Sequence, residues 1–216
     1  MSQETVQPTG PKPSLFRFIP SPVEQFKRMK ERPVVWIPAL IVFIFFAISM
    51  VLSALLPEMV QMMAESSGIS TEQAQNFAMV SVGVTSIFIF PITLLISAFV
   101  SYLIVKVVGG ETTFKHMLTF SIFIMFITTI GQVINYGVAA AAGTDPNVTS
   151  LNGLIGLEGT AGGILNTIEI FTIWSVILTG IGLPIVTGIS KRAGWMIAGI
   201  LFIITFVMAI FGGAAV

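Results

Sequence analysis

Residues 164–192, ILNTIEIFTIWSVILTGIGLPIVTGISKR, contain an apolar run long enough to cross a lipid bilayer. About 20 apolar residues span the roughly 30 Å hydrocarbon core of a membrane, so residues 164–189 are predicted to form a transmembrane helix. The run contains one carboxylate, Glu169, and it is followed by two adjacent cations, Lys191 and Arg192. These charges make the segment a reference point for the topology of the whole chain.

The composition is typical of an integral membrane protein. Of the 216 residues, 55% are hydrophobic and only 9% are charged, and the mean hydropathy is +0.96. A soluble domain with this composition would aggregate, so we expect an all-α polytopic membrane protein. The chain has no cysteine, which excludes disulfides, thiol nucleophiles and cysteine-based metal sites.

Five apolar runs are predicted to cross the membrane as helices and to form one membrane domain over residues 34–216. They are residues 34–56, 78–108, 117–142, 164–189 and 195–211. Residues 1–20 are polar and rich in proline at their start, and we expect a disordered cytoplasmic tail there. The predicted organisation is therefore a tail, a short helix at 21–33 and a five-span bundle.

Residues 21–33 are predicted to form a basic amphipathic helix. Ser21 at the N-cap, Pro22 at the first helical position and Glu24 two residues later match a capping box. The apolar positions alternate with four cations, Lys27, Arg28, Lys30 and Arg32. Such a helix either lies in the headgroup plane of an anionic leaflet or is a solvated juxtamembrane helix whose cations only set orientation. The sequence leaves these two alternatives open.

The charges are distributed asymmetrically along the chain. All ten Lys and Arg residues lie before the first run, between the second and third, or between the fourth and fifth. The opposite loops carry five acids instead: Glu58, Glu65, Glu72, Asp145 and Glu158. By the positive-inside rule, the N-terminus is predicted to be cytoplasmic and the C-terminus external.

Two pairs of polar residues interrupt the apolar runs. Gln132 and Asn135 are three residues apart, as are Asn166 and Glu169, so each pair is predicted to share one helix face. Polar groups in a membrane normally face protein, and hydrogen bonding or capping between helices is the favoured interpretation. The alternative is a small channel or secondary transporter that uses Glu169 and Asn166.

Enzymatic chemistry is not expected. The single histidine, His116, lies in a predicted cytoplasmic loop, whereas Glu169 lies near the other face of the membrane, so the two cannot cooperate. We predict no catalytic residues, no cofactor and no metal site, because the sequence offers no cluster of metal ligands. Nucleic-acid binding is not expected either, since the one basic cluster is juxtamembrane.

Three phrases of the sequence resemble a known family. They are SPVEQFKRMKERP at 21–33, GGETTFKHML at 109–118, and FTIW at 171–174 with its following glycines and the GISKR that ends at Arg192. Together they are similar to the bacterial, YknW-like branch of the Yip (Ypt-interacting protein) domain family over about residues 20–211. The phrase FSIFIM at 120–125 lacks a proline that members of the family often carry there.

The resemblance implies an accessory role in a bacterial plasma membrane. Relatives in the bacterial branch are linked to ABC exporters as additional membrane components, so the expected partners are permease or adaptor subunits of such an exporter, besides membrane lipids. The expected working surfaces are the helix at 22–32 and a glycine face formed by Gly180, Gly182 and Gly188, where close backbone approach favours association. The sequence leaves open whether copies of the chain associate with each other.

Overall fold

The structure, a computed structural model, describes residues 10–212, and its regular elements are helices. Their bounds in chain order are α1 Leu15–Phe18, α2 Pro22–Glu31, α3 Trp36–Ala54, α4 Pro57–Ser67, α5 Thr71–Val107, α6 Phe114–Ala142, α7 Leu151–Ile155, α8 Gly159–Thr167, α9 Ile170–Thr187 and α10 Lys191–Gly212. The all-α class predicted from the sequence is confirmed.

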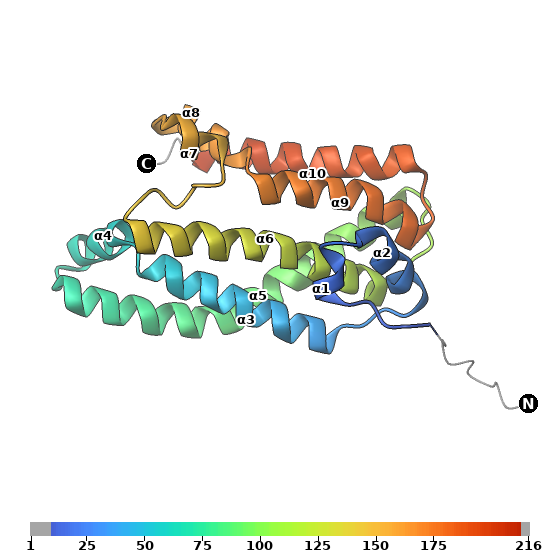
Figure 1. The fold of residues 1–216 in the computed structure, drawn as a ribbon, viewed down its shortest axis with the longest axis horizontal. Helices are drawn as coiled ribbons and strands as arrows, with labels where there is room; N and C mark the ends of the chain where they lie inside the picture. Colours follow the sequence, from blue (N-terminus) through green and yellow to red (C-terminus); the bar gives the residue numbers. More distant parts are fainter. Residues whose placement is uncertain (1–9, 213–216) are drawn as a thin grey trace, which may run out of the picture.

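The long helices form a bundle along one axis (Figure 1). Helix α6 packs against α3, α5 and α9, and α10 packs on the outer side of α9. Of the most apolar stretch in α6, 56% of residues are buried, compared with 22% in α3 and 17% in α5. Helix α6 is therefore the centre of the bundle, while α3 and α5 present most of their surface to the outside.

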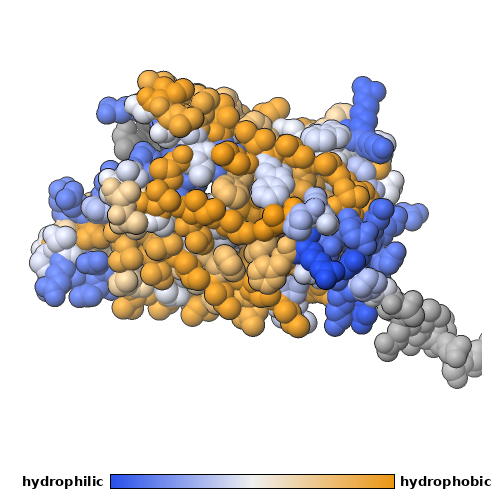
Figure 2. Space-filling view, in the orientation of Figure 1, coloured by the Kyte–Doolittle hydropathy of each residue, from blue (hydrophilic) through white to orange (hydrophobic). Residues whose placement is uncertain are grey.

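Four described helices are long and apolar enough to cross a membrane, namely α3, α5, α6 and α9. Helix α10 lies alongside α9 and returns toward the opposite end of the bundle (Figure 1). An apolar band covers the middle of the molecule and hydrophilic residues collect at both ends (Figure 2). This surface is that of an integral membrane protein, because the apolar side chains face lipid instead of water.

The charges predicted to lie on opposite sides of the membrane occupy opposite ends of the bundle. The basic end contains α1, α2 and the turns that join α5 to α6 and α9 to α10, and all ten Lys and Arg residues belong to it. The acidic end contains α4, the start of α5, α7 and α8, with Glu58, Glu65, Glu72, Asp145 and Glu158.

Helix α5 illustrates how local sequence sets the bounds of an element. Ser70 accepts a hydrogen bond from the amide of Gln73, and the Gln73 side chain accepts one from the amide of Ser70, so a complete capping box begins the helix. The helix continues for 37 residues with Pro91 inside it. At 1.5 Å per residue it is about 55 Å long, far more than the hydrocarbon core requires.

The N-terminal segment differs from the expected disordered tail. Residues 10–20 are described, and α1 buries Leu15 and Phe18 against the bundle. The backbone amide of Ser14 donates to Gln25 Oε1 at 2.9 Å, which fastens this segment to α2. Burial of apolar side chains late in the segment therefore offsets the ordering cost that its polar start suggested. Residues 1–9 of the predicted tail lie outside the described residues.

The run at 164–189 also differs, because the structure divides it into α8 and α9 at Ile168 and Glu169. Glu169 has an extended backbone, with φ −119° and ψ 141°, and forms an isolated antiparallel bridge with Ser150. The loop after α6 thus forms the backbone hydrogen bonds that a continuous helix would otherwise form at this position. The expectation of one continuous helix from residue 164 was wrong.

Candidate functional site

Helix α2 folds onto the basic end of the bundle and does not lie apart from it. Phe26 and Met29 are fully buried, and α2 packs against α6 and α9. The Phe26 ring meets Phe18 edge-on with centroids 5.1 Å apart and stacks on Phe120 at 5.6 Å. The side of α2 that carries Phe26 and Met29 is therefore filled by the protein itself, and the two alternatives drawn from the sequence concern only its exposed, basic side.

The capping box predicted at Ser21 is not formed. The Ser21 side chain makes no capping hydrogen bond, and Glu24 pairs instead with Arg28, with Oε1 3.1 Å from Nε. Glu24 therefore stabilises the helix through an i,i+4 ion pair on its exposed face, which contributes a few tenths of a kcal/mol.

The four cations assigned to α2 are arranged differently from one another. Lys27 and Lys30 are exposed, whereas Arg28 is partly buried and paired with Glu24. Arg32 follows the helix and donates from Nη1 to the carbonyl of Gly10 at 3.3 Å. Lys27 and Lys30 have no carboxylate partner in the described part of the chain, so α2 presents them on a fixed platform.

His116 joins α6 to α2. Its Nε2 lies 3.1 Å from the carbonyl oxygen of Lys30, and its Nδ1 lies 2.7 Å from Thr113 Oγ1. A carbonyl oxygen only accepts, so Nε2 donates to it and the Thr113 hydroxyl donates to Nδ1 in the neutral ring. The one histidine of the chain is thus a structural link at the basic end.

The glycine face of α9 is occupied inside the molecule. A Cβ on Gly182 would lie 2.5 Å from Phe26 Cε1 and 2.7 Å from Phe120 Cε2, and one on Gly180 would lie 2.6 Å from Trp195 Cε3. Gly188 instead ends α9 in the left-handed region, with φ 76°. Gly180 and Gly182 therefore admit aromatic rings from α2, α6 and α10. This corrects the expectation that they form a working surface for a partner.

A polar cluster holds the acidic end together. Thr149 Oγ1 lies 2.9 Å from Asn135 Oδ1 and 2.6 Å from Glu169 Oε1, and the Thr149 amide donates to Asn135 Oδ1 at 3.0 Å. Glu169 Oε2 accepts from the amide of Thr172 at 2.7 Å and caps α9. Both carboxylate oxygens of this partly buried side chain thus have partners.

The remaining predicted polar residues extend these contacts. Asn166 Oδ1 accepts from Ser150 Oγ at 3.1 Å, which ties α8 to the loop before α7. Gln132 is exposed and its Oε1 lies 3.5 Å from Ser49 Oγ of α3, at the outer limit of a hydrogen bond. The structure therefore brings Asn135 and Glu169 together through Thr149, and it leaves Gln132 outside that cluster.

Sequence reasoning missed Thr149 and Ser150, because their partners are 14 to 20 residues away and no local pattern marks them. Within residues 10–212 no group of three or more His, Asp or Glu side chains is arranged to hold a metal ion.

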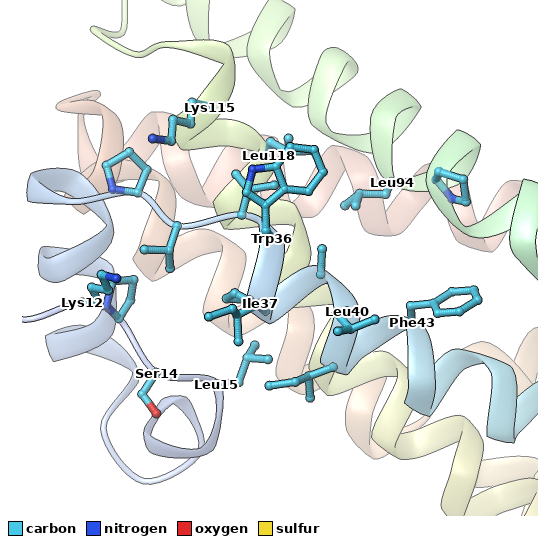
Figure 3. A pocket seen from close by; sticks show the side chains of 18 of the residues that line it. Lys12, Ser14, Leu15, Trp36, Ile37, Leu40, Phe43, Leu94, Lys115 and Leu118 are labelled. Carbon is cyan, nitrogen blue, oxygen red and sulfur yellow. The ribbon is translucent and has the colours of Figure 1, made fainter.

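An apolar groove at the basic end was also missed. It has a volume of about 1190 Å³ and lies between α3, α5 and the segment before α1 (Figure 3). Lys12 and Lys115 lie at one end of the view, and Phe43 and Leu94 lie toward the other. Arg32 is the third cation of the lining, and no carboxylate lines the groove. Its residues come from four separate parts of the sequence, so no local motif could have predicted it.

Comparison with known proteins agrees with this architecture. The model of the Yip1 domain matches residues 16–212. The chain is 41% identical to the membrane protein YknW of Bacillus subtilis (strain 168) over 216 residues, which covers 94% of this chain and 90% of that relative. No solved structure matches.

The family match extends from α1 to the end of α10, so it covers both ends of the bundle as well as the apolar helices. The resemblance inferred from the sequence is confirmed. This chain belongs to the Yip1 domain family and is an integral membrane protein.

Proposed function

We propose that this protein is a non-enzymatic accessory component that binds, or helps to assemble, a partner membrane complex, and that the partner is an ABC-type exporter. The observation that carries the proposal is the exposed pair Lys27 and Lys30 on α2. Because Phe26 and Met29 anchor the helix in the bundle, the backbone that carries the two lysines has a fixed position. A preorganised basic surface suits an acidic segment of a permease or adaptor subunit, since complementary charge gives orientation and specificity.

The proposed topology has five spans, with α10 as the fifth. Helix α10 is 22 residues long, about 33 Å, and begins with Lys191 and Arg192 at the basic end. The positive-inside rule then gives a cytoplasmic basic end and an external C-terminus. This topology would place Lys27 and Lys30 on the side where an exporter's nucleotide-binding and cytoplasmic loops lie. A reporter fused to the C-terminus and found in the cytoplasm would contradict it.

The transporter alternative receives less support from the geometry. Glu169 is engaged by Thr149 and Thr172, and Asn166 is engaged by Ser150. Their side chains thus fix where α8 ends and α9 begins. A carboxylate held in this way is suited to positioning a helix, and we assign Glu169 that role.

Charge reversal on α2 tests the accessory function. The tagged protein is purified from native membranes in mild detergent, and co-purifying proteins are measured by quantitative mass spectrometry. We expect the starting protein to recover permease or adaptor subunits, and Lys27→Glu with Lys30→Glu to lower that recovery about tenfold or more, since like charges at an interface cost several kcal/mol.

The matched control is Lys191→Glu with Arg192→Glu, which makes the same charge change at the same end of the bundle, away from α2. It should leave recovery within about twofold. An equal loss in both double variants would show that general surface charge matters and the α2 platform does not. Recovery of no exporter subunit by the starting protein would overturn the choice of partner.

A further inference from the structure

The groove at the basic end has the size and lining expected for a long apolar ligand. Its volume of about 1190 Å³ exceeds the roughly 300–1,000 Å³ of usual small-molecule pockets. Its walls include Leu40 and Phe43 of α3 and Leu94 and Leu95 of α5. Trp36 at the mouth is 86% exposed. A tryptophan in such a position is typical of the level of lipid headgroups.

The depth of the groove matches one leaflet of a bilayer. Phe43 lies seven residues beyond the start of α3, which is about 10 Å, and Leu94 lies thirteen residues before the end of α5, which is about 20 Å. Half of a 30 Å hydrocarbon core is about 15 Å. The apolar walls therefore run from the basic end to roughly the depth that acyl chains of one leaflet occupy.

The mouth of the groove is basic. Lys12, Arg32 and Lys115 belong to its lining, and none of them is paired with a carboxylate among residues 10–212. The backbone amides of Trp36 and Ile37, in the first turn of α3, have no acceptor in that same part of the chain, and no side chain caps this helix. Cations and free amides together favour a phosphate.

We propose that this groove binds one anionic phospholipid, with its phosphate at Lys12, Arg32 and Lys115 and its acyl chains between α3 and α5. A second copy of the chain would bring the same three cations to the mouth and would be repelled. An apolar helix of a partner would leave the cations without counter-charge. The acyl chains of the lipid match the apolar walls, and its phosphate matches the cations at the mouth. Its binding is independent of the exporter proposed above.

Quenching of Trp36 fluorescence by brominated acyl chains tests the proposal. The chain has three tryptophans, so Trp174→Phe with Trp195→Phe leaves Trp36 as the only emitter. The full-length protein is placed in phosphatidylcholine nanodiscs with a small, fixed mole fraction of either brominated phosphatidylglycerol or brominated phosphatidylcholine. We expect the anionic lipid to quench Trp36 severalfold more strongly. Each cation contributes about fivefold to the relative affinity, which corresponds to roughly 1 kcal/mol.

Two triple variants make the result specific to the groove. Lys12→Gln, Arg32→Gln and Lys115→Gln together should abolish the preference, whereas Lys12→Arg with Lys115→Arg should preserve it. The matched control, Lys27→Gln, Lys30→Gln and Lys191→Gln, removes the same charge from exposed positions at the same end and should retain it. Circular dichroism and size-exclusion elution of each variant verify that it folds.

Equal quenching by the two lipids in the single-tryptophan protein would overturn the proposal, as would an equal loss of preference in both glutamine triple variants. If neither lipid quenches and each nanodisc contains two chains, a second copy fills the groove and the lipid site is wrong.

Discussion

The two ends of this bundle are closed by different kinds of interaction. At the basic end, aromatic rings from α1, α2 and α6 pack together, and Phe18 meets both Phe26 and Phe123 with centroids 5.1 and 5.3 Å apart. At the acidic end, Thr149 links Asn135 to Glu169 by hydrogen bonds. Packing is non-directional and fills space, whereas hydrogen bonds fix individual atoms.

The difference has a structural consequence for α9, which touches both ends. Its start, at the acidic end, is set at one residue, because Glu169 caps it and bridges to Ser150. Its other half is held by the rings that fill the space over Gly180 and Gly182. Hydrogen bonds at the acidic end therefore fix the first residue of α9, and ring packing at the basic end fixes which helices lie against it.

The largest expected effect on stability comes from removing an aromatic ring at the basic end. Phe26→Ala removes a fully buried ring from between Phe18, Phe120 and Gly182. We expect the free energy of unfolding to fall by about 3–5 kcal/mol, because the lost contacts leave a cavity. Unfolding in mixed detergent micelles measures this change. Val23→Ala, on the exposed side of the same helix, is the control and should change it by less than about 1 kcal/mol.

A second observable sharpens the test. Because the chain has no cysteine, Met29→Cys reports on whether α2 stays docked. This buried thiol should react slowly with a polar maleimide, and faster once Phe26→Ala is added. Unchanged reactivity would show that α2 is held mainly by contacts other than the aromatic ones.

An intermediate effect is expected at the acidic end. Glu169→Ala removes the cap of Thr172 and the partner of Thr149, which should cost about 1–3 kcal/mol of unfolding free energy. Glu158→Ala is the matched control, because Glu158 occupies the N-cap of α8 without making a side-chain hydrogen bond. Equal destabilisation by the two variants in the same micelle assay would remove Glu169 from its proposed positioning role.

The smallest effect separates two serines that look alike in sequence. Ser70 forms a complete capping box and Ser21 does not. Ser70→Ala should therefore lower the free energy of unfolding by about 1 kcal/mol, and Ser21→Ala by less than about 0.5 kcal/mol. The order of the two thermal midpoints is the measurement, and a reversed order would contradict the assignment of these caps.

The sequence predicted the long helices well because hydropathy is a property of contiguous residues. The runs at 34–56 and 117–142 correspond closely to α3 and α6. The helix α4 was missed, since Pro57–Ser67 is polar and amphipathic and carries no membrane signal. The number of spans that cross the membrane and the sides on which the termini lie remain predictions.

The arrangement of the polar and basic residues was much harder to predict. Glu169 looked like a charge within one apolar helix, and only contact with a loop 20 residues earlier ends α8 beside it. Phe26 and Met29 lie on a helix whose surroundings the sequence left open, and contacts with α1, α6 and α9 bury them. Local sequence patterns therefore predicted where the helices lie, whereas long-range contacts determine which helix faces are buried in the bundle.

The packing of α2 on α9 also constrains how the protein is made. About 150 residues separate Phe26 from Gly182, and a ribosome that adds 5–20 residues per second needs roughly 8–30 s to synthesise them. During that interval the rings of Phe18 and, later, Phe120 are available to pack against Phe26, and α9 is the last of its neighbours to be made. The apolar side of α2 is therefore enclosed in two steps, first by the rings of α1 and α6 and then by α9 at Gly182.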